Sequence, residues 1–99
     1  MQTKIATWLR SKGCYVLVIQ PQAGIPDACP DILALFDGGG WATLEVKKSD
    51  PYKRDGQAKA GAFQPLQQLT VEKLNRMYYS RVVWPENWER IRQELTNLI

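Results

Sequence analysis

The sequence predicts an α/β fold, with a mixed β-sheet of about four strands flanked by helices in the order αβββαβα. Three observations support this prediction. Short apolar runs rich in β-branched residues alternate with segments whose apolar residues recur every three or four positions. Clusters of Gly and Pro separate these segments. One glycine-rich turn joins two of the apolar runs directly, which adds a hairpin to an otherwise alternating order and makes the sheet mixed.

The elements are expected in order along 99 residues, a length that suits one domain over 1–99. Ile5, Trp8 and Leu9 share one face of the first helix. The first strand is apolar almost throughout, which predicts burial on both faces. The predicted elements are a helix at 3–12, strands at 14–19, 31–36 and 41–47, a mobile basic loop at 48–62, a helix opened by Pro65, a strand at 81–84 and a helix opened by Pro85.

The two C-terminal helices carry the other core positions. Apolar residues in the helix after Pro65 are expected to face inward, namely Leu66, Leu69, Leu74 and Met77. The last helix repeats apolar residues at helical spacing, namely Trp88, Ile91, Leu95 and Leu98. Trp8 and Trp88 mark the first and last helices as core or interface elements.

Composition restricts the chemistry. The chain has no histidine, which excludes a Ser-His-Asp triad, a Cys-His dyad and a histidine-ligated metal within it. Cys14 and Cys29 are interpreted as reduced, packed thiols. No apolar stretch approaches the roughly 20 residues of a membrane span, and no leader pattern is present, so a cytoplasmic protein is expected. The net charge of +3 is compatible with a nucleic-acid partner.

One constellation of polar residues lies inside the predicted strands. Asp31 begins the second strand, while Glu45 and Lys47 share one face of the third. Charged groups on a half-buried strand need partners. Two carboxylates and the Val46 carbonyl would form a hard-oxygen site for Mg²⁺ or Mn²⁺. Lys47 would orient a water or stabilise charge at a phosphate, so these residues suit phosphodiester hydrolysis.

The register of the hairpin decides whether Asp31 can meet Glu45. A four-residue turn would pair Phe36 with Trp41 and place Asp31 on the wrong face. A three-residue loop, Asp37–Gly39, would instead set Asp31 opposite Glu45. The run of glycines favours that loop or a glycine bulge, and one of these is predicted.

Pro30-Asp31 followed by Glu45-Val46-Lys47 resembles the PD-(D/E)xK nuclease pattern. The order of elements is similar to the restriction-endonuclease-like core of that superfamily, and the closest resemblance is to the VRR-NUC (virus-type replication-repair nuclease) group and Holliday-junction resolvase-like members. The resemblance covers roughly residues 13–84. A Gly-containing loop before Pro-Asp matches 24–32, and a glutamine-bearing helix matches 63–74.

The resemblance implies the site residues and the activity. Asp31, Glu45, Lys47 and Gln67 would be catalytic, with Asp31, Glu45 and Val46 holding Mg²⁺ or Mn²⁺. Helix phasing favours Gln67 and leaves Gln68 as the alternative; whether Asp27 joins the site stays open. The implied activity is a metal-dependent endodeoxyribonuclease, structure-selective for branched DNA such as Holliday junctions and acting as a homodimer. A phage-encoded protein acting in the host cytoplasm would suit such a domain.

A second patch of charge lies next to these residues. Residues 47–59 hold five basic and two acidic side chains. Lys48, Lys53, Arg54 and Lys59 are therefore candidate ligands for DNA phosphates, and Tyr52 a candidate base-stacking residue. A solvated, non-binding loop is the alternative. At the level of function, the alternative to the nuclease is a non-catalytic nucleic-acid-binding or assembly module on the same fold.

Overall fold

The computed structural model describes residues 1–20, 22–25 and 28–99. Apart from the last helix, its elements lie within one or two residues of the predicted ones, because the apolar periodicity marks the body of an element better than its ends. The last helix begins at Trp88, three residues after Pro85, because a 3₁₀ turn precedes it. The helices and strands are α1 (Gln2–Ser11), β1 (Tyr15–Val18), β2 (Ile32–Leu35), β3 (Trp41–Val46), α2 (Gln67–Met77), β4 (Ser80–Val83), a short 3₁₀ turn η1 (Pro85–Asn87) and α3 (Trp88–Leu98).

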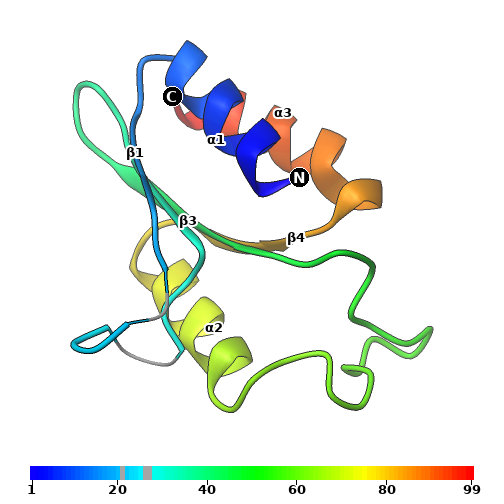
Figure 1. Cartoon of the computed structure of the whole chain (residues 1–99). Helices are drawn as coiled ribbons and strands as arrows, with labels where there is room; N and C mark the ends of the chain where they lie inside the picture. Colours follow the sequence, from blue (N-terminus) through cyan, green and yellow to red (C-terminus); the bar gives the residue numbers. More distant parts are fainter. Residues whose placement is uncertain (21, 26–27) are drawn as a thin grey trace.

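The four strands form one mixed sheet in the order β1-β2-β3-β4. The pairs β1–β2 and β2–β3 are antiparallel, and β3–β4 is parallel because helix α2 provides the crossover. Helices α1 and α3 cover one face of the sheet, and α2 lies against the other (Figure 1). The predicted mixed α/β architecture with a four-stranded sheet is thus confirmed.

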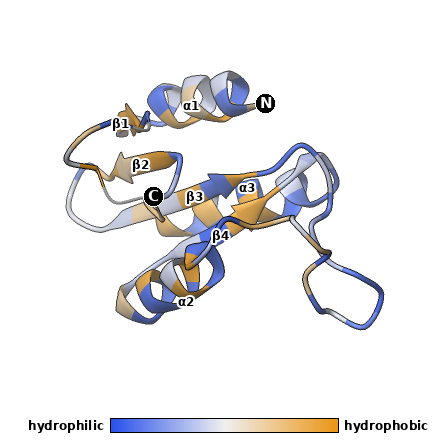
Figure 2. Cartoon of the chain, turned by 60° about the horizontal axis from the view of Figure 1, so that its bottom comes forward, coloured by the Kyte–Doolittle hydropathy of each residue, from blue (hydrophilic) through white to orange (hydrophobic). Residues whose placement is uncertain are grey.

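The core lies between the sheet and the α1–α3 pair. Its fully buried side chains include Ile5, Leu9, Ile32, Leu44, Val83, Ile91 and Leu95. Strand residues are mainly hydrophobic, while hydrophilic residues appear toward the end of β3 (Figure 2). None of the helices in the described part of the chain combines the length and apolar character needed to cross a membrane.

Trp8 and Trp88 belong to this packing. Their rings meet edge to face with centroids 5.5 Å apart, and Trp88 is only 5% exposed. Trp88 is therefore a core residue, and the pair joins α1 to α3 within one chain.

Two predictions about the opposite face of the sheet are wrong. Strand β1 is not buried on both faces: Tyr15 is 66% exposed and Leu17 also faces solvent. Helix α2 packs on β3 and β4, so the outer face of β1 stays uncovered. In the same helix region Leu66, Leu69 and Met77 are exposed rather than inward-facing, because its inner face is turned toward polar residues of β3.

The β2–β3 hairpin has the register that a three-residue loop requires. The Phe36 amide donates to the Gly40 carbonyl at 3.0 Å, closing Asp37–Gly39. The pairing Ile32↔Leu44, continued by one residue, sets Asp31 opposite Glu45. This prediction is confirmed.

The segment after β3 is more ordered than predicted. Tyr52 and Ala58 form a β-bridge, closing a small turn at 52–58 that is called the basic hairpin below. The Tyr52 ring packs against Phe63 and Trp84, each with centroids 5.8 Å away. These aromatic contacts anchor the base of the hairpin, which projects from the body at the right of Figure 1.

Candidate functional site

Glu45 is a buried carboxylate near the end of β3. It is 3% exposed and lies on the sheet face that α2 covers, beside a buried pair formed by the Thr43 and Ser80 hydroxyls at 2.7 Å. The alternation of the strand puts Leu44 on the opposite face, in the core. The charged residue is therefore held in place by a strand whose other face is firmly packed.

Gln67, the first residue of α2, links the polar groups of the site. Its Nε2 donates to Glu45 Oε1 at 2.7 Å, while its Oε1 accepts from Lys47 Nζ at 3.0 Å and from the Gln64 amide at 2.8 Å. Of the two glutamines considered, Gln67 is the one in contact with Glu45. The Gln68 side chain lies at the Tyr52 hydroxyl instead.

Lys47 follows β3 and faces the same group. Its Nζ is 3.6 Å from Glu45 Oε1 and 4.8 Å from the centre of the Phe63 ring. The ring attracts the ammonium through its π-face and shields one side of it. The cation is thus fixed by three neighbours: a carboxylate, an amide oxygen and an aromatic face.

The electrostatics of the site disfavour a second negative charge. Burial, and after it the Asp31 charge, raise the pKa of Glu45 to about 7, although Lys47 opposes the shift. A cation placed between the carboxylates would offset both unfavourable effects. The donor set is thus chemically suited to a hard divalent cation.

Asp31 directly precedes β2 and accepts a hydrogen bond from the Val46 amide on Oδ2 at 2.8 Å. This bond ties the two strands together at the site. Each carboxylate oxygen has two lone pairs, so Asp31 and Glu45 keep capacity for a metal. Within the described residues no group of three or more His, Cys, Asp or Glu side chains gathers around one point. A cation here would therefore need further oxygens, such as the Val46 carbonyl, water or a substrate phosphate.

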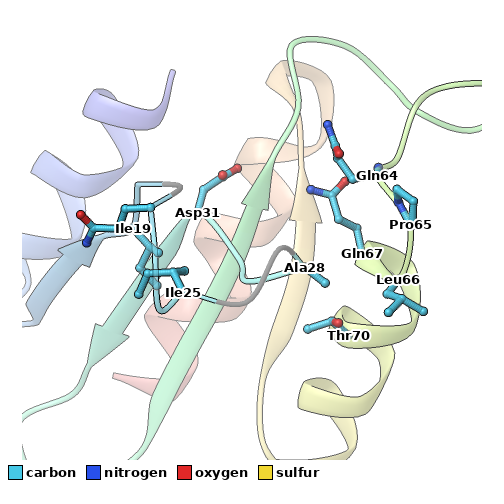
Figure 3. A pocket seen from close by; sticks show the side chains of 10 residues that line it. Ile19, Ile25, Ala28, Asp31, Gln64, Pro65, Leu66, Gln67 and Thr70 are labelled. Carbon is cyan, nitrogen blue, oxygen red and sulfur yellow. Dashed lines mark hydrogen bonds between the residues drawn. The ribbon is translucent and has the colours of Figure 1, made fainter.

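A cavity of about 840 Å³ opens beside these residues, between the loop before β2 and the start of α2. Asp31 lies on one side of β3 in this view, and Gln64 and Gln67 lie on the other (Figure 3). Leu66, at the rim, has φ +69°, the left-handed region that costs a leucine about 1–2 kcal/mol. That strained residue joins the Gln64 turn to α2 and so aims Gln67 at Glu45.

The predicted phosphate ligands fall into two groups. Lys48 and Lys59 line a cleft of about 320 Å³ together with Lys47; this cleft is called the basic cleft below. Lys53 and Arg54 are exposed in the basic hairpin and do not line it. The structure thus brings two of the four to the candidate site. Tyr52, the candidate stacking residue, is half-buried against Phe63 and Trp84.

Three residues at the site were not singled out from the sequence. Phe63 and Gln64 stand in the string before Gln67, but only the fold shows that they contact Lys47 and Gln67. Cys29 lies close enough to both carboxylates that their charges, after burial, raise the pKa of its thiol. Its only sequence signal was its position two residues before Asp31. Asp27 lies outside the described residues.

Comparison of the chain with protein-family models, with curated proteins and with solved structures finds no match. We therefore infer a function from the site itself and from the motif resemblance.

Proposed function

We propose that this chain is a metal-dependent endodeoxyribonuclease of the PD-(D/E)xK type, on a restriction-endonuclease-like fold of the VRR-NUC group. One observation carries the proposal: Asp31 and Glu45 oppose each other across two strands, while Lys47 and Gln67 are hydrogen-bonded beside Glu45. That arrangement joins two carboxylates, an ammonium and an amide within one buried polar cluster. A purely structural ion pair would not need the second carboxylate.

Each residue has a separate role in the proposed reaction. Asp31, Glu45 and the Val46 carbonyl hold Mg²⁺ or Mn²⁺, which when bound lowers the pKa of a water and screens phosphate charge. Lys47 orients the attacking water or stabilises the charge that develops on the phosphate. Gln67 positions Lys47 through the 3.0 Å hydrogen bond. Lys48 and Lys59 hold neighbouring DNA phosphates in the basic cleft.

The proposed substrate is branched DNA, cut by a homodimer. Symmetric cleavage of a junction requires two active sites, which a two-fold dimer supplies.

One exposed surface of the sheet suits a dimer contact. It consists of four side chains, called the apolar row: Tyr15, Leu35 and Trp41, which are adjacent across three strands, and Tyr78, whose ring centre lies 5.8 Å from that of Trp41. Tyr15, Leu35 and Tyr78 are all exposed. Soluble monomers rarely leave large contiguous apolar patches open, so a second copy is assigned to this row.

Cleavage of labelled DNA tests the proposal. The purified protein is incubated with a four-way junction and with linear duplex, in Mg²⁺ or in EDTA. We expect junction cleavage in Mg²⁺ alone, and a loss of about 100-fold or more in rate for Lys47→Ala. Lys73→Ala, an exposed change on α2, is the matched control and keeps the wild-type rate.

Two outcomes would overturn the proposed nuclease activity. Cleavage of no substrate at all is one, and equal cleavage by wild type and Lys47→Ala is the other. Tight junction binding without cleavage would favour the non-catalytic nucleic-acid-binding module instead, because the basic cleft would then act alone.

A further inference from the structure

Two cavities of different character meet at the candidate site. The basic cleft is lined by three lysines, Lys47 among them, and by one acidic residue, Asp50. The larger cavity, about 840 Å³, is lined by Asp31 and Gln67 on the side of the site. The hydrogen bond from Lys47 to Gln67 stands between the two. A strand of nucleic acid that crosses the site would therefore place one side of the cut in each.

The larger cavity is unsuited to phosphate. Asp31 is the only ionisable side chain among the described residues that line it, so none of them supplies the positive charge that would hold a backbone phosphate. The other described residues that line it are apolar or neutral and polar, and they include Ile19, Ile25, Ala28, Leu66, Gln64 and Thr70. This surface is called the neutral cavity below. Apolar walls with an amide and a hydroxyl match the chemistry of a nucleobase, which has apolar faces and hydrogen-bonding edges.

The size of the neutral cavity agrees with that chemistry. Its volume lies within the roughly 300–1,000 Å³ typical of small-ligand sites. A base within a continuous duplex is stacked and paired, so it cannot enter without leaving its partner strand. An unpaired base enters at a much smaller cost.

We propose that the neutral cavity holds one unpaired base of the cleaved strand, next to the phosphodiester at Asp31 and Glu45, while the basic cleft holds the backbone on the other side. This inference rests on the proposed function and names its substrate class. The preferred substrates are nucleic acids with an unpaired nucleotide at the cut, as at a junction branch point or a bulge, rather than continuous duplex.

Binding in EDTA tests the inference separately from catalysis. Two duplexes of one sequence are compared, one continuous and one with a single bulged 2-aminopurine. We expect about tenfold tighter binding of the bulged duplex by fluorescence anisotropy, and a rise in 2-aminopurine fluorescence as the base leaves the stack. Equal affinity, or no rise in fluorescence, would overturn the inference.

A cavity-filling variant locates the base. Thr70→Trp projects a large ring into the neutral cavity from α2 and is expected to remove the tenfold preference. The same substitution at Thr7, exposed on α1, keeps the preference. If Thr70→Trp does not fold, Ile25→Trp fills the same cavity from the facing loop. A full preference in a folded cavity variant would contradict the assignment.

Repeating the experiment with Mg²⁺ distinguishes failure of the base site from failure of the proposed nuclease activity. With Mg²⁺ added, absence of cleavage of both duplexes and of the four-way junction refutes the nuclease. A bulge preference lost in Thr70→Trp would in that case still support the base site. Cleavage of both duplexes at one rate with equal affinity refutes the base site and leaves the nuclease standing.

Discussion

At the scale of single residues, the site depends on how Glu45 is neutralised. A buried carboxylate beside another carboxylate favours its protonated form. Lys47 forms an ion pair with Glu45, and Gln67 donates a hydrogen bond to it. None of the buried side-chain polar atoms in the described residues lacks a hydrogen-bond partner. The cluster therefore has all its hydrogen bonds without a metal. The two neighbouring carboxylates still repel each other, and a bound cation would reduce that repulsion.

Replacement of Glu45 by glutamine should stabilise the metal-free protein at high pH. The folded-state pKa of about 7 lies above the ordinary 4.5, so the folded protein holds this proton more tightly than the unfolded chain. That contribution to stability is complete below about pH 4.5 and is lost as pH rises through about 7. In EDTA at pH 8 we expect Glu45→Gln to raise the free energy of unfolding by about 1–3 kcal/mol.

Urea unfolding at pH 5 and pH 8 measures this effect. The gain should shrink toward zero at pH 5, where wild-type Glu45 is protonated. The exposed change Glu86→Gln serves as control and should show no such pH dependence. A Glu45→Gln protein less stable than wild type at pH 8 would mean that the ion pair with Lys47 outweighs burial.

At the scale of elements, two local conformations set the geometry of the site. The β2–β3 loop fixes which carboxylates face each other, and the turn before α2 aims Gln67. The first could be predicted, because the glycine run restricts the loop and a one-residue slip would move Asp31 to the other face. The second could not, since nothing in Pro65-Leu66-Gln67 indicates a leucine in the left-handed region.

Gly40 should tolerate substitution less well than its neighbour. At φ +87°, a Cβ on Gly40 would lie 3.0 Å from the Tyr78 hydroxyl and 3.2 Å from the Phe36 ring. Gly39 also has a positive φ, but open space surrounds it. We expect Gly40→Ala to cost about 1–2 kcal/mol more than Gly39→Ala, as measured by chemical denaturation. Equal costs would show that the hairpin end adjusts freely.

Leu66→Gly and Leu69→Gly should shift stability in opposite directions. Leu66 is 65% exposed, so glycine relieves backbone strain while losing little burial, a gain of about 0.5–1 kcal/mol. Leu69 is similarly exposed, at 62%, but lies inside α2, where glycine costs about 1 kcal/mol. Thermal melting of both variants measures these changes, with a higher Tm expected for Leu66→Gly and a lower one for Leu69→Gly. A loss in both would mean that the Leu66 side chain, rather than its backbone, holds the turn.

The leucine pattern of the α2 region wrongly predicted which side chains face inward, and the reason is physical. Leucine spacing shows which residues share a face, but it does not show what that face meets. Gln67 is buried against Glu45 while Leu66 and Leu69 are exposed, since the covered part of the sheet is polar there. Gln67, the glutamine that the motif phasing favoured, is the one in contact with Glu45, and its proposed role stays a prediction. The partners of Lys47 could not be inferred, because Phe63 lies sixteen positions along the chain and reaches it only through the fold.

At the scale of the whole molecule, the sheet is covered unevenly. Helices α1 and α3 share one face, whereas α2 leaves the β1 side of the other open. The apolar row lies along that open side, and this arrangement depends on tertiary packing that strand periodicity does not report. The uneven cover moves the expected dimer surface away from Trp8 and Trp88 and onto the sheet.

A charge in the apolar row should therefore separate the proposed dimer. Tyr15→Lys places an ammonium in the apolar row, within the proposed dimer contact, which disfavours association strongly. Sedimentation equilibrium should give about twice the chain mass of 11.3 kDa for wild type and about 11.3 kDa for the variant. Thr7→Lys, on exposed α1, should leave the mass unchanged. A wild-type monomer at all concentrations would refute the dimer.

Anomalous diffraction from crystals soaked in Mn²⁺ tests whether Asp31 and Glu45 share one cation, on which the proposed reaction depends. We expect a manganese peak within coordination distance of both Asp31 and Glu45, with the Gln67 hydrogen bond to Glu45 loosened or displaced. Millimolar Mn²⁺ that leaves this position without a peak, while Asp31 keeps Val46 and Glu45 keeps Gln67, would contradict it.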